Sequence, residues 1–228
     1  MRYGFYLPTR GPLANRSDLS AILDTAEKVG FASTMVADHI ILPTKIDSPY
    51  PYTVKGNFLS QGECFEQLAL MSFVAARTET MRIVSSVMIV PHRNPVFNAK
   101  SLATIDVLSE GRVTVGIGVG WMEEEFKALD TASFKDRGGV TDEYVNIFRK
   151  LWTGKPVSYK GEYYSFDEVI CEPVPVQQPG PPVWIGDIPT RRFAVLQNWG
   201  MAGIPSVPPP HPRCRRPKCE RSWTKLKA

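Results

Sequence analysis

Short apolar segments with strand character alternate with amphipathic helical segments along residues 1–186, and this alternation limits the fold more than any other feature. Each repeat is about 30–45 residues long, enough for one strand and one crossover helix. The predicted strands are 2–7, 34–37, 81–90, 112–119 and 182–186, and the predicted helices are 17–29, 63–77, 95–110, 121–129 and 139–153. Right-handed crossovers and a parallel sheet follow from this order. The sequence therefore predicts either a doubly wound sheet or a (β/α)8 barrel.

The pattern changes twice towards the end of the chain. Alternating aromatic residues in 157–159 and 162–166 predict a β-hairpin, and a proline-rich stretch follows it. Residues 1–186 carry 18 Lys and Arg against 21 Asp and Glu, whereas residues 187–228 carry 9 against 2 and seven of the 20 prolines. We therefore expect an acidic domain over 1–186 and a separate basic, proline-rich tail over 187–228.

Composition excludes several classes of protein. With 43% hydrophobic and 22% charged residues the chain is typical of a globular domain, and its apolar runs are shorter than the ~20 residues of a membrane helix. Four scattered cysteines indicate a reducing, cytoplasmic location rather than a disulfide scaffold. The only metal-like spacing, His211 with Cys214 and Cys219, is unconvincing, so no metal site is predicted. The acidic domain gives no reason to expect a nucleic-acid or membrane partner.

Candidate functional residues follow four of the predicted strands. They are Asp38-His39, Ser85-Ser86-Val87, Gly116-x-Gly118-x-Gly120-Trp121 and Gly186. In parallel α/β folds the carboxyl ends of the strands share one rim, where reactions take place. His39 suits general acid–base chemistry, although a structural histidine bonded to a loop carbonyl is an alternative. The glycines allow either a flat ligand or a neighbouring element to approach closely.

Two further charged segments have plainer interpretations. Arg93 follows the third strand and could hold a phosphate, but a solvated loop is the more ordinary reading. Glu123, Glu124 and Glu125 are most simply a solvent-exposed face at a helix N-terminus, where acidic side chains are favourable. The glycine-rich segment is not a dinucleotide fingerprint, because Trp121 stands where that motif requires glycine.

The order of these motifs resembles that of the bacterial-luciferase-like oxidoreductases, most closely the branch that uses the deazaflavin coenzyme F420. The motifs that carry the resemblance span residues 1–186 and are 38–43 (DHIILP), 91–95 (PHRNP), 99–112 (AKSLATIDVLSEGR), 116–121 (GIGVGW), 125–126 (EF) and 181–186 (PPVWIG). The resemblance implies a (β/α)8 barrel of which this chain contains about five units. It also implies a small-molecule substrate and, for full-length members, a homodimer.

The resemblance also implies roles for individual residues around a flat cofactor ring. His39 would transfer the proton that accompanies hydride transfer, and Asp38 would hold His39 or the ring. Ser86 and Val87 match a bulge, often with a cis peptide, that backs the ring. Gly118 and Gly120 would let the ring approach the fourth strand, and Gly186 would begin a turn that binds the cofactor phosphate. These implied cofactor contacts are Asp38, His39, Ser86, Val87, Gly118, Gly120 and Gly186.

One departure from the family pattern concerns the substrate. Sugar-phosphate dehydrogenases of the F420 branch have a catalytic glutamate where this chain has Trp121, so an apolar or carbonyl substrate beside Trp121 and Phe58 is expected instead. Two alternatives stay open: a reduced-FMN-dependent monooxygenase that activates dioxygen, and an inactive truncated remnant.

A second departure begins at Asp187, where the family has glycine and where the similarity stops. One nucleotide restored after codon 186, with permitted codons, turns the next residues into a Gly-Gly turn, an amphipathic helix and a Gly-Asp-Gly-Trp strand start. Residues 187–228 are therefore interpreted as an out-of-frame tail. We expect the strand at 182–186 to be left as an exposed edge, the product to be poorly soluble, and the carboxylate of Asp187 to weaken cofactor binding.

Overall fold

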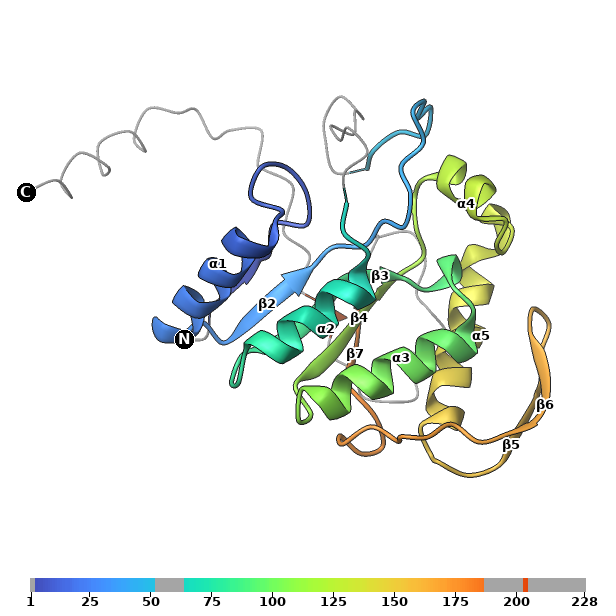
Figure 1. The fold of residues 1–228 in the computed structure, drawn as a ribbon. Helices are drawn as coiled ribbons and strands as arrows, with labels where there is room; N and C mark the ends of the chain where they lie inside the picture. The colour runs from blue at the N-terminus through green and yellow to red at the C-terminus, as the bar shows by residue number, and fades with distance from the viewer. Residues whose placement is uncertain (1–2, 52–63, 187–202, 205–228) are drawn as a thin grey trace, which may run out of the picture.

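A curved parallel sheet with helices along its outer face forms the centre of the molecule (Figure 1). The computed structural model describes residues 3–51, 64–186 and 203–204. The sheet has the order β1-β2-β3-β4-β7-β8, and each neighbouring pair is parallel. Its strands are β1 (Gly4–Tyr6), β2 (Ser33–Val36), β3 (Arg82–Ile89), β4 (Val113–Gly118), β7 (Val183–Gly186) and β8 (Gly203–Ile204).

The connections between these strands confirm the predicted alternation. Helix α1 (Arg16–Lys28) links β1 to β2, α2 (Gln67–Arg77) links β2 to β3, and α3 (Pro95–Leu108) links β3 to β4. Between β4 and β7 lie α4 (Glu123–Leu129), α5 (Arg137–Leu151) and the predicted hairpin, formed by β5 (Val157–Lys160) and β6 (Ser165–Val169). The order and the handedness rule favour the barrel over a doubly wound sheet, because β1 to β4 are added in sequence without reversal.

The core lies between the outer face of the sheet and the helices. Alternate strand residues point outward: Ile83 pairs with Val113 and Ile117 pairs with Ile185, and all four are buried. Helices α2, α3 and α5 contribute the facing side chains, including Met71, Leu102, Val145 and Phe148. Burial of this apolar surface stabilises the packing of the helices on the sheet. The packing in turn holds the strands, and the residues at their carboxyl ends, in fixed directions.

The edge of β7 differs from the expectation. Ile185 pairs with Gly203 and Gly186 pairs with Ile204, so the prediction that this strand ends the sheet as an exposed edge is wrong for those two residues. The remainder of the predicted tail, 187–202 and 205–228, lies outside the described residues. The division at residue 186 therefore stays a prediction.

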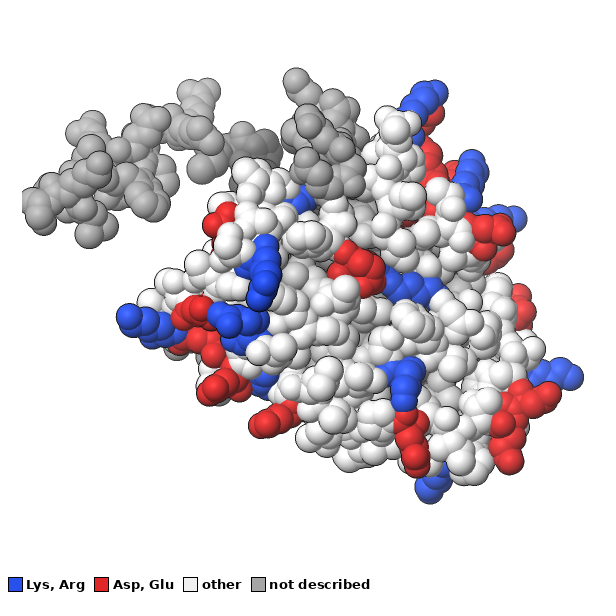
Figure 2. All heavy atoms as spheres, viewed as in Figure 1, with Lys and Arg blue, Asp and Glu red and all other residues white. Residues whose placement is uncertain are grey.

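One surface feature bears on partners. Figure 2 shows few charged side chains over α2 and α3, where Phe97 and Leu108 are more than half exposed. The homodimer that the resemblance implies stays a prediction.

Within the described parts of the chain, no helix combines the length and the hydrophobicity that crossing a membrane requires.

Candidate functional site

The predicted site residues follow strands that are neighbours in the sheet. Asp38 and His39 come after β2, Ser86 and Val87 lie within β3, Gly118 ends β4, and Gly186 ends β7. Because β2, β3, β4 and β7 are adjacent and parallel, their carboxyl ends form one rim. The topology therefore brings together segments that are more than 140 residues apart in sequence.

A bulge in β3 forms the floor of this rim. The peptide bond between Ser86 and Val87 is cis, as expected, and the pairing of β3 with β4 shifts register between Ser85 and Met88. The hydroxyl groups of Ser86 and Tyr6, the last residue of β1, lie 2.6 Å apart and share a hydrogen bond. The bulge is thus tied to strands on both sides.

Glycine is required at two positions because of Val87. A Cβ atom on Gly118 would lie 2.5 Å from Cγ2 of Val87, and one on Gly186 would lie 3.1 Å from its Cγ1. The half-buried Val87 side chain therefore fills the space that larger residues would take. The sequence interpretation offered packing as an alternative to ligand approach, and packing accounts for Gly118.

Gly120 has a different environment. Its φ angle of +84° lies in the left-handed region, and an added Cβ would meet Phe126 at 2.7 Å and Ile89 at 2.9 Å. Turn geometry and close packing thus explain this glycine without a ligand. Its predicted contact with a cofactor ring stays a prediction.

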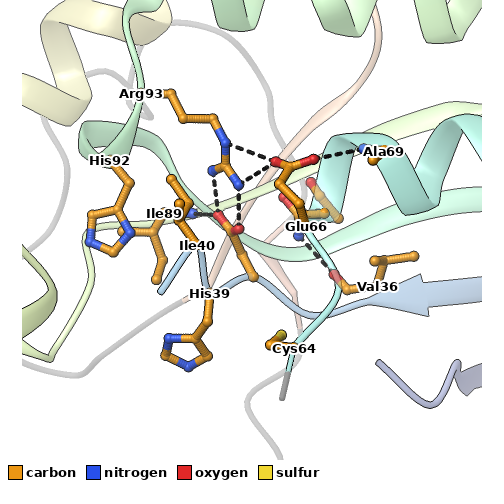
Figure 3. A network of polar contacts seen from close by, with 12 residues as sticks. Val36, His39, Ile40, Cys64, Glu66, Ala69, Ile89, His92 and Arg93 are labelled. Atoms are coloured by element: carbon orange, nitrogen blue, oxygen red, sulfur yellow. Dashed lines mark hydrogen bonds and ion pairs between the residues drawn. The ribbon is translucent and has the colours of Figure 1, made fainter. Parts of the chain in front are cut away.

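Asp38 is buried and belongs to the network of polar contacts around Arg93 and Glu66 that Figure 3 shows. Arg93 donates to its two carboxylate oxygens from Nη1 at 2.9 Å and from Nη2 at 2.7 Å, and the backbone N–H of Ile89 donates at 2.8 Å. The Asp38 side chain is fully buried. Its carboxylate is thus held by Arg93 and Ile89, and Nδ1 of His39 is bound by Glu125. The expected contact of Asp38 with a cofactor ring stays a prediction.

Arg93 connects three elements. It follows the 3-10 helix Val90–His92, holds Asp38 after β2, and donates from Nη2 to Glu66 at 2.7 Å. Glu66 is also the N-cap of α2, accepting from the backbone N–H of Ala69. Burial alone would lower the pKa of Arg93, but the two carboxylates outweigh it and raise that pKa. The solvated loop predicted here is wrong, and the guanidinium is committed to protein carboxylates instead of a phosphate.

Glu125 is the functional residue that the sequence interpretation missed. Its Oε2 lies 2.8 Å from Nδ1 of His39, and its side chain has no exposed surface. Its Oε1 accepts from the backbone N–H groups of Ile40 at 2.8 Å and Ile41 at 3.3 Å. The exposed helix face predicted for the three glutamates is wrong at Glu125. The one available signal was its place in a family motif beside Phe126.

Glu124, its neighbour, has a separate function. Its carboxylate accepts from the backbone N–H groups of Asp47 at 2.8 Å and Ser48 at 2.9 Å. Partial desolvation acts to raise its pKa, but the hydrogen bonds from Ser48 and Asp47 prevail and lower the pKa to about 2. Glu124 thus fixes the loop after His39 and is ionised at neutral pH.

His92 is a second imidazole close to Glu125. Its Nδ1 lies 3.8 Å from Oε1 of Glu125, and its ring packs edge-on against Phe126 with the centroids 4.5 Å apart. Burial is the main cause that lowers the pKa of His92 to about 4, so its ring is neutral at pH 7. Of the two imidazole rings near Glu125, His39 is therefore the one that makes the closer contact with its carboxylate.

Aromatic side chains line the same part of the rim. The Trp121 ring stands edge-on to His39 with centroids 6.4 Å apart, and Tyr50 lies 5.0 Å from Trp121. Trp121 thus lies beside His39, and its predicted place in a substrate pocket stays a prediction. Phe58, the other predicted pocket residue, lies outside the described residues. Residues 3–51 and 64–186 contain no group of three side chains arranged to hold a metal ion.

A hollow of about 370 Å³ lies elsewhere, between the start of α3, α5 and the hairpin. Its polar lining includes Asn94, whose side chain caps α3 and donates to the hydroxyl oxygen of Tyr164 at 2.6 Å. Arg93, also in the lining, is bound to Asp38 and Glu66. Asn94 and Arg93 are therefore engaged in structure, and the rim is the better candidate.

Comparison with known proteins decides the family. The model of the luciferase-like monooxygenase family matches residues 1–188. The chain belongs to this family. Members are monooxygenases and oxidoreductases, and the fold of this chain is accordingly a partial luciferase-like (β/α)8 barrel.

Among three relatives, the names of two give different cofactors. An uncharacterized protein of Mycobacterium tuberculosis is 31% identical over 78% of this chain and 62% of its own length. An F420-dependent glucose-6-phosphate dehydrogenase from Segniliparus rotundus is 34% identical over 71% of this chain and 47% of its own length. An FMNH2-dependent dimethylsulfone monooxygenase from Pseudomonas putida is 28% identical over 53% of this chain and 34% of its own length.

Solved structures agree on the fold. A monooxygenase from Streptomyces bottropensis has a TM-score of 0.64 and 24% identity, covering 83% of this chain and 54% of that one. An F420-dependent secondary alcohol dehydrogenase, solved with an F420–acetone adduct, has a TM-score of 0.63 and 25% identity, covering 82% of this chain and 52% of that one. The chain thus spans about half the length of these structures and 62% of its mycobacterial relative.

Proposed function

We propose that the rim binds coenzyme F420 and that the protein transfers hydride between this coenzyme and a small organic alcohol or carbonyl compound. The observation that carries the proposal is the position of His39, at the end of β2 beside the β3 bulge, with Nδ1 bound to a buried carboxylate. The 34% identity to an F420-dependent dehydrogenase supports the choice of coenzyme.

The residues of the rim fit a planar ring. A Cβ atom at Gly118 or at Gly186 would crowd the side chain of Val87, so both glycines leave room for it on the rim. Ser86 and Val87 would support one face of the ring, while the neighbouring glycines leave its edges clear. The turn that would bind a phosphate begins at Gly186 and continues into residues outside the described part. When bound, the coenzyme supplies a ring carbon that accepts or donates hydride.

His39 would move the proton that accompanies the hydride. With Nδ1–H donated to Glu125, the lone pair of the neutral ring lies on Nε2, which can accept a proton from a substrate hydroxyl. In alcohol oxidation Nε2 of His39 would take the hydroxyl proton, and a bound coenzyme would supply the acceptor for the carbinol hydride, so that the product is a carbonyl compound. The reverse reaction returns both. Asp38 takes no part in proton transfer in this scheme, because Arg93 and Ile89 hold its carboxylate.

The surroundings of His39 favour an uncharged substrate with an apolar or aromatic body. Trp121 and Tyr50 form an aromatic wall beside His39. Glu124, at the start of α4 and ionised at neutral pH, would repel a phosphate group. A secondary alcohol or ketone therefore suits this rim better than a sugar phosphate, even though one relative is named for glucose 6-phosphate.

The main alternative is a monooxygenase that uses reduced FMN, as the Pseudomonas putida relative does by name. Two assays separate the possibilities: hydride exchange between reduced F420 and ketones, and oxygen consumption with reduced FMN. We expect exchange with F420 and no substrate-dependent oxygen consumption. The opposite result would replace the proposal with the monooxygenase, and inactivity in both assays would favour the inactive remnant.

A further inference from the structure

The two oxygens of Glu125 have divided tasks. Oε1 accepts from two backbone N–H groups, those of Ile40 and Ile41, and Oε2 lies 2.8 Å from Nδ1 of His39. The carboxylate is completely buried and reaches these groups from α4, across 85 residues of sequence. One side chain thus holds both the backbone after His39 and the His39 ring.

This contact determines which nitrogen of His39 carries the proton. Glu125 accepts from two backbone N–H groups at Oε1, and if Oε2 likewise acts as an acceptor, the 2.8 Å contact requires a proton on Nδ1. In the neutral ring Nε2 then has the lone pair. We propose that Glu125 is a positioning residue that holds His39 in the Nδ1–H tautomer and so makes Nε2 the base. The use of that base in hydride transfer rests on the proposed function, whereas the tautomer itself does not.

Other charged groups near the pair do not supply this function. His92 faces Oε1 of Glu125 at 3.8 Å from the 3-10 helix, and its burial keeps it neutral at pH 7. Asp38 and Arg93 also face His92, but they are bound to each other as a buried ion pair. Glu125 is therefore the acceptor that sets the tautomer of His39.

The substitution Glu125→Gln separates positioning from mere space-filling, because glutamine has nearly the same shape. Its amide oxygen can keep the two backbone donors of Ile40 and Ile41. Its NH2 group then faces Nδ1 of His39, which must become an acceptor, and the proton moves to Nε2. The fold is kept while the tautomer is reversed.

The test is ¹⁵N NMR of histidine-labelled full-length chain, without coenzyme and above pH 7, with His39→Asn used to assign the His39 signals. We expect the Nδ1–H tautomer in the unmodified chain and the Nε2–H tautomer in Glu125→Gln. Glu124→Gln is the matched control: its side chain is bonded to Asp47 and Ser48, so the His39 signals should not change. An Nε2–H tautomer in the unmodified chain, or an unchanged tautomer in Glu125→Gln, would overturn the proposal.

Kinetics provide a second readout. In an active preparation Glu125→Gln should lower kcat for alcohol oxidation by about a hundredfold or more while KM changes little, because the base is lost and the binding surface is kept. A reversed tautomer without F420 activity in any variant would refute the proposed function and leave the positioning role intact. If Glu125→Gln fails to fold, the tautomer of the unmodified chain still decides the matter.

Discussion

Asp38 and His39 are adjacent in sequence, yet their side chains have opposite environments. Asp38 is fixed by a two-point contact with Arg93, and Nδ1 of His39 is bound to the carboxylate of Glu125. A buried ion pair is costly to disrupt because removal of one partner leaves the other charge desolvated. The residue next to the proposed proton carrier therefore stabilises the rim instead of taking part in proton transfer.

Replacement of Asp38 should accordingly reduce stability. We expect Asp38→Asn to lower the free energy of unfolding by about 3–5 kcal/mol, since Arg93 would lose its buried counter-charge. Urea unfolding measures this change. The control is Asp24→Asn, which breaks the exposed pair with Arg77 and should cost less than about 1 kcal/mol. Unchanged stability with loss of turnover in Asp38→Asn would instead indicate a role in proton transfer.

The buried His92 predicts a specific pH dependence of stability. Below its ordinary pKa of 6.5 the unfolded chain binds a proton that the folded chain excludes until about pH 4. Above pH 6.5 His92 therefore has no effect on the free energy of unfolding. As the pH falls from 6.5 towards 4, that free energy decreases by about 3 kcal/mol in total. Urea unfolding across this range should show the loss in the unmodified chain and a much smaller one in His92→Gln. If the free energy of unfolding falls equally with pH in both chains, the buried His92 is not the cause of the loss.

At the level of strands and helices, periodicity predicts nearly all that is observed. The apolar run over 81–90 becomes β3 (Arg82–Ile89), and the aromatic alternation at 157–166 becomes the hairpin β5–β6. The position of Glu125 could not be read in this way, because three consecutive glutamates are chemically identical until a fold turns one inward. Long-range partners such as Arg93 and Asp38, 55 residues apart, are equally invisible to local pattern. Local periodicity thus predicts elements, whereas site geometry depends on tertiary packing.

The contact between the β3 bulge and the end of β4 gives a prediction at this scale. Gly118→Ala should lower the free energy of unfolding by about 1–3 kcal/mol, because the new Cβ would lie 2.5 Å from Cγ2 of Val87. Gly138→Ala in α5 is the control: an added Cβ there meets nothing within 4 Å, so stability should be unchanged or slightly increased. In the Val87→Ala background the Gly118→Ala penalty should shrink. An equal penalty in both backgrounds would show that Val87 is not its cause.

For the whole molecule, the chain spans about half the length of the solved structures that it resembles. We propose that residues 187–228 are an out-of-frame tail, on the grounds that the family match ends at residue 188 and that one restored nucleotide yields family-like sequence. A chain with the frame restored after codon 186 should bind F420 at least tenfold more tightly in a fluorescence titration. Equal affinity, or an intact reading frame in several independent clones, would refute the frame hypothesis.

Deuteride transfer tests the central claim, that His39 moves the proton of an F420-dependent hydride transfer on this rim. The full chain, with F420 at saturating concentration, is supplied with secondary alcohols deuterated at the carbinol carbon, and the coenzyme is examined by mass spectrometry. We predict that deuterium reaches the coenzyme ring and that His39→Ala slows this transfer by about a hundredfold or more. Absence of label in the coenzyme, or transfer undiminished by His39→Ala, would contradict the account.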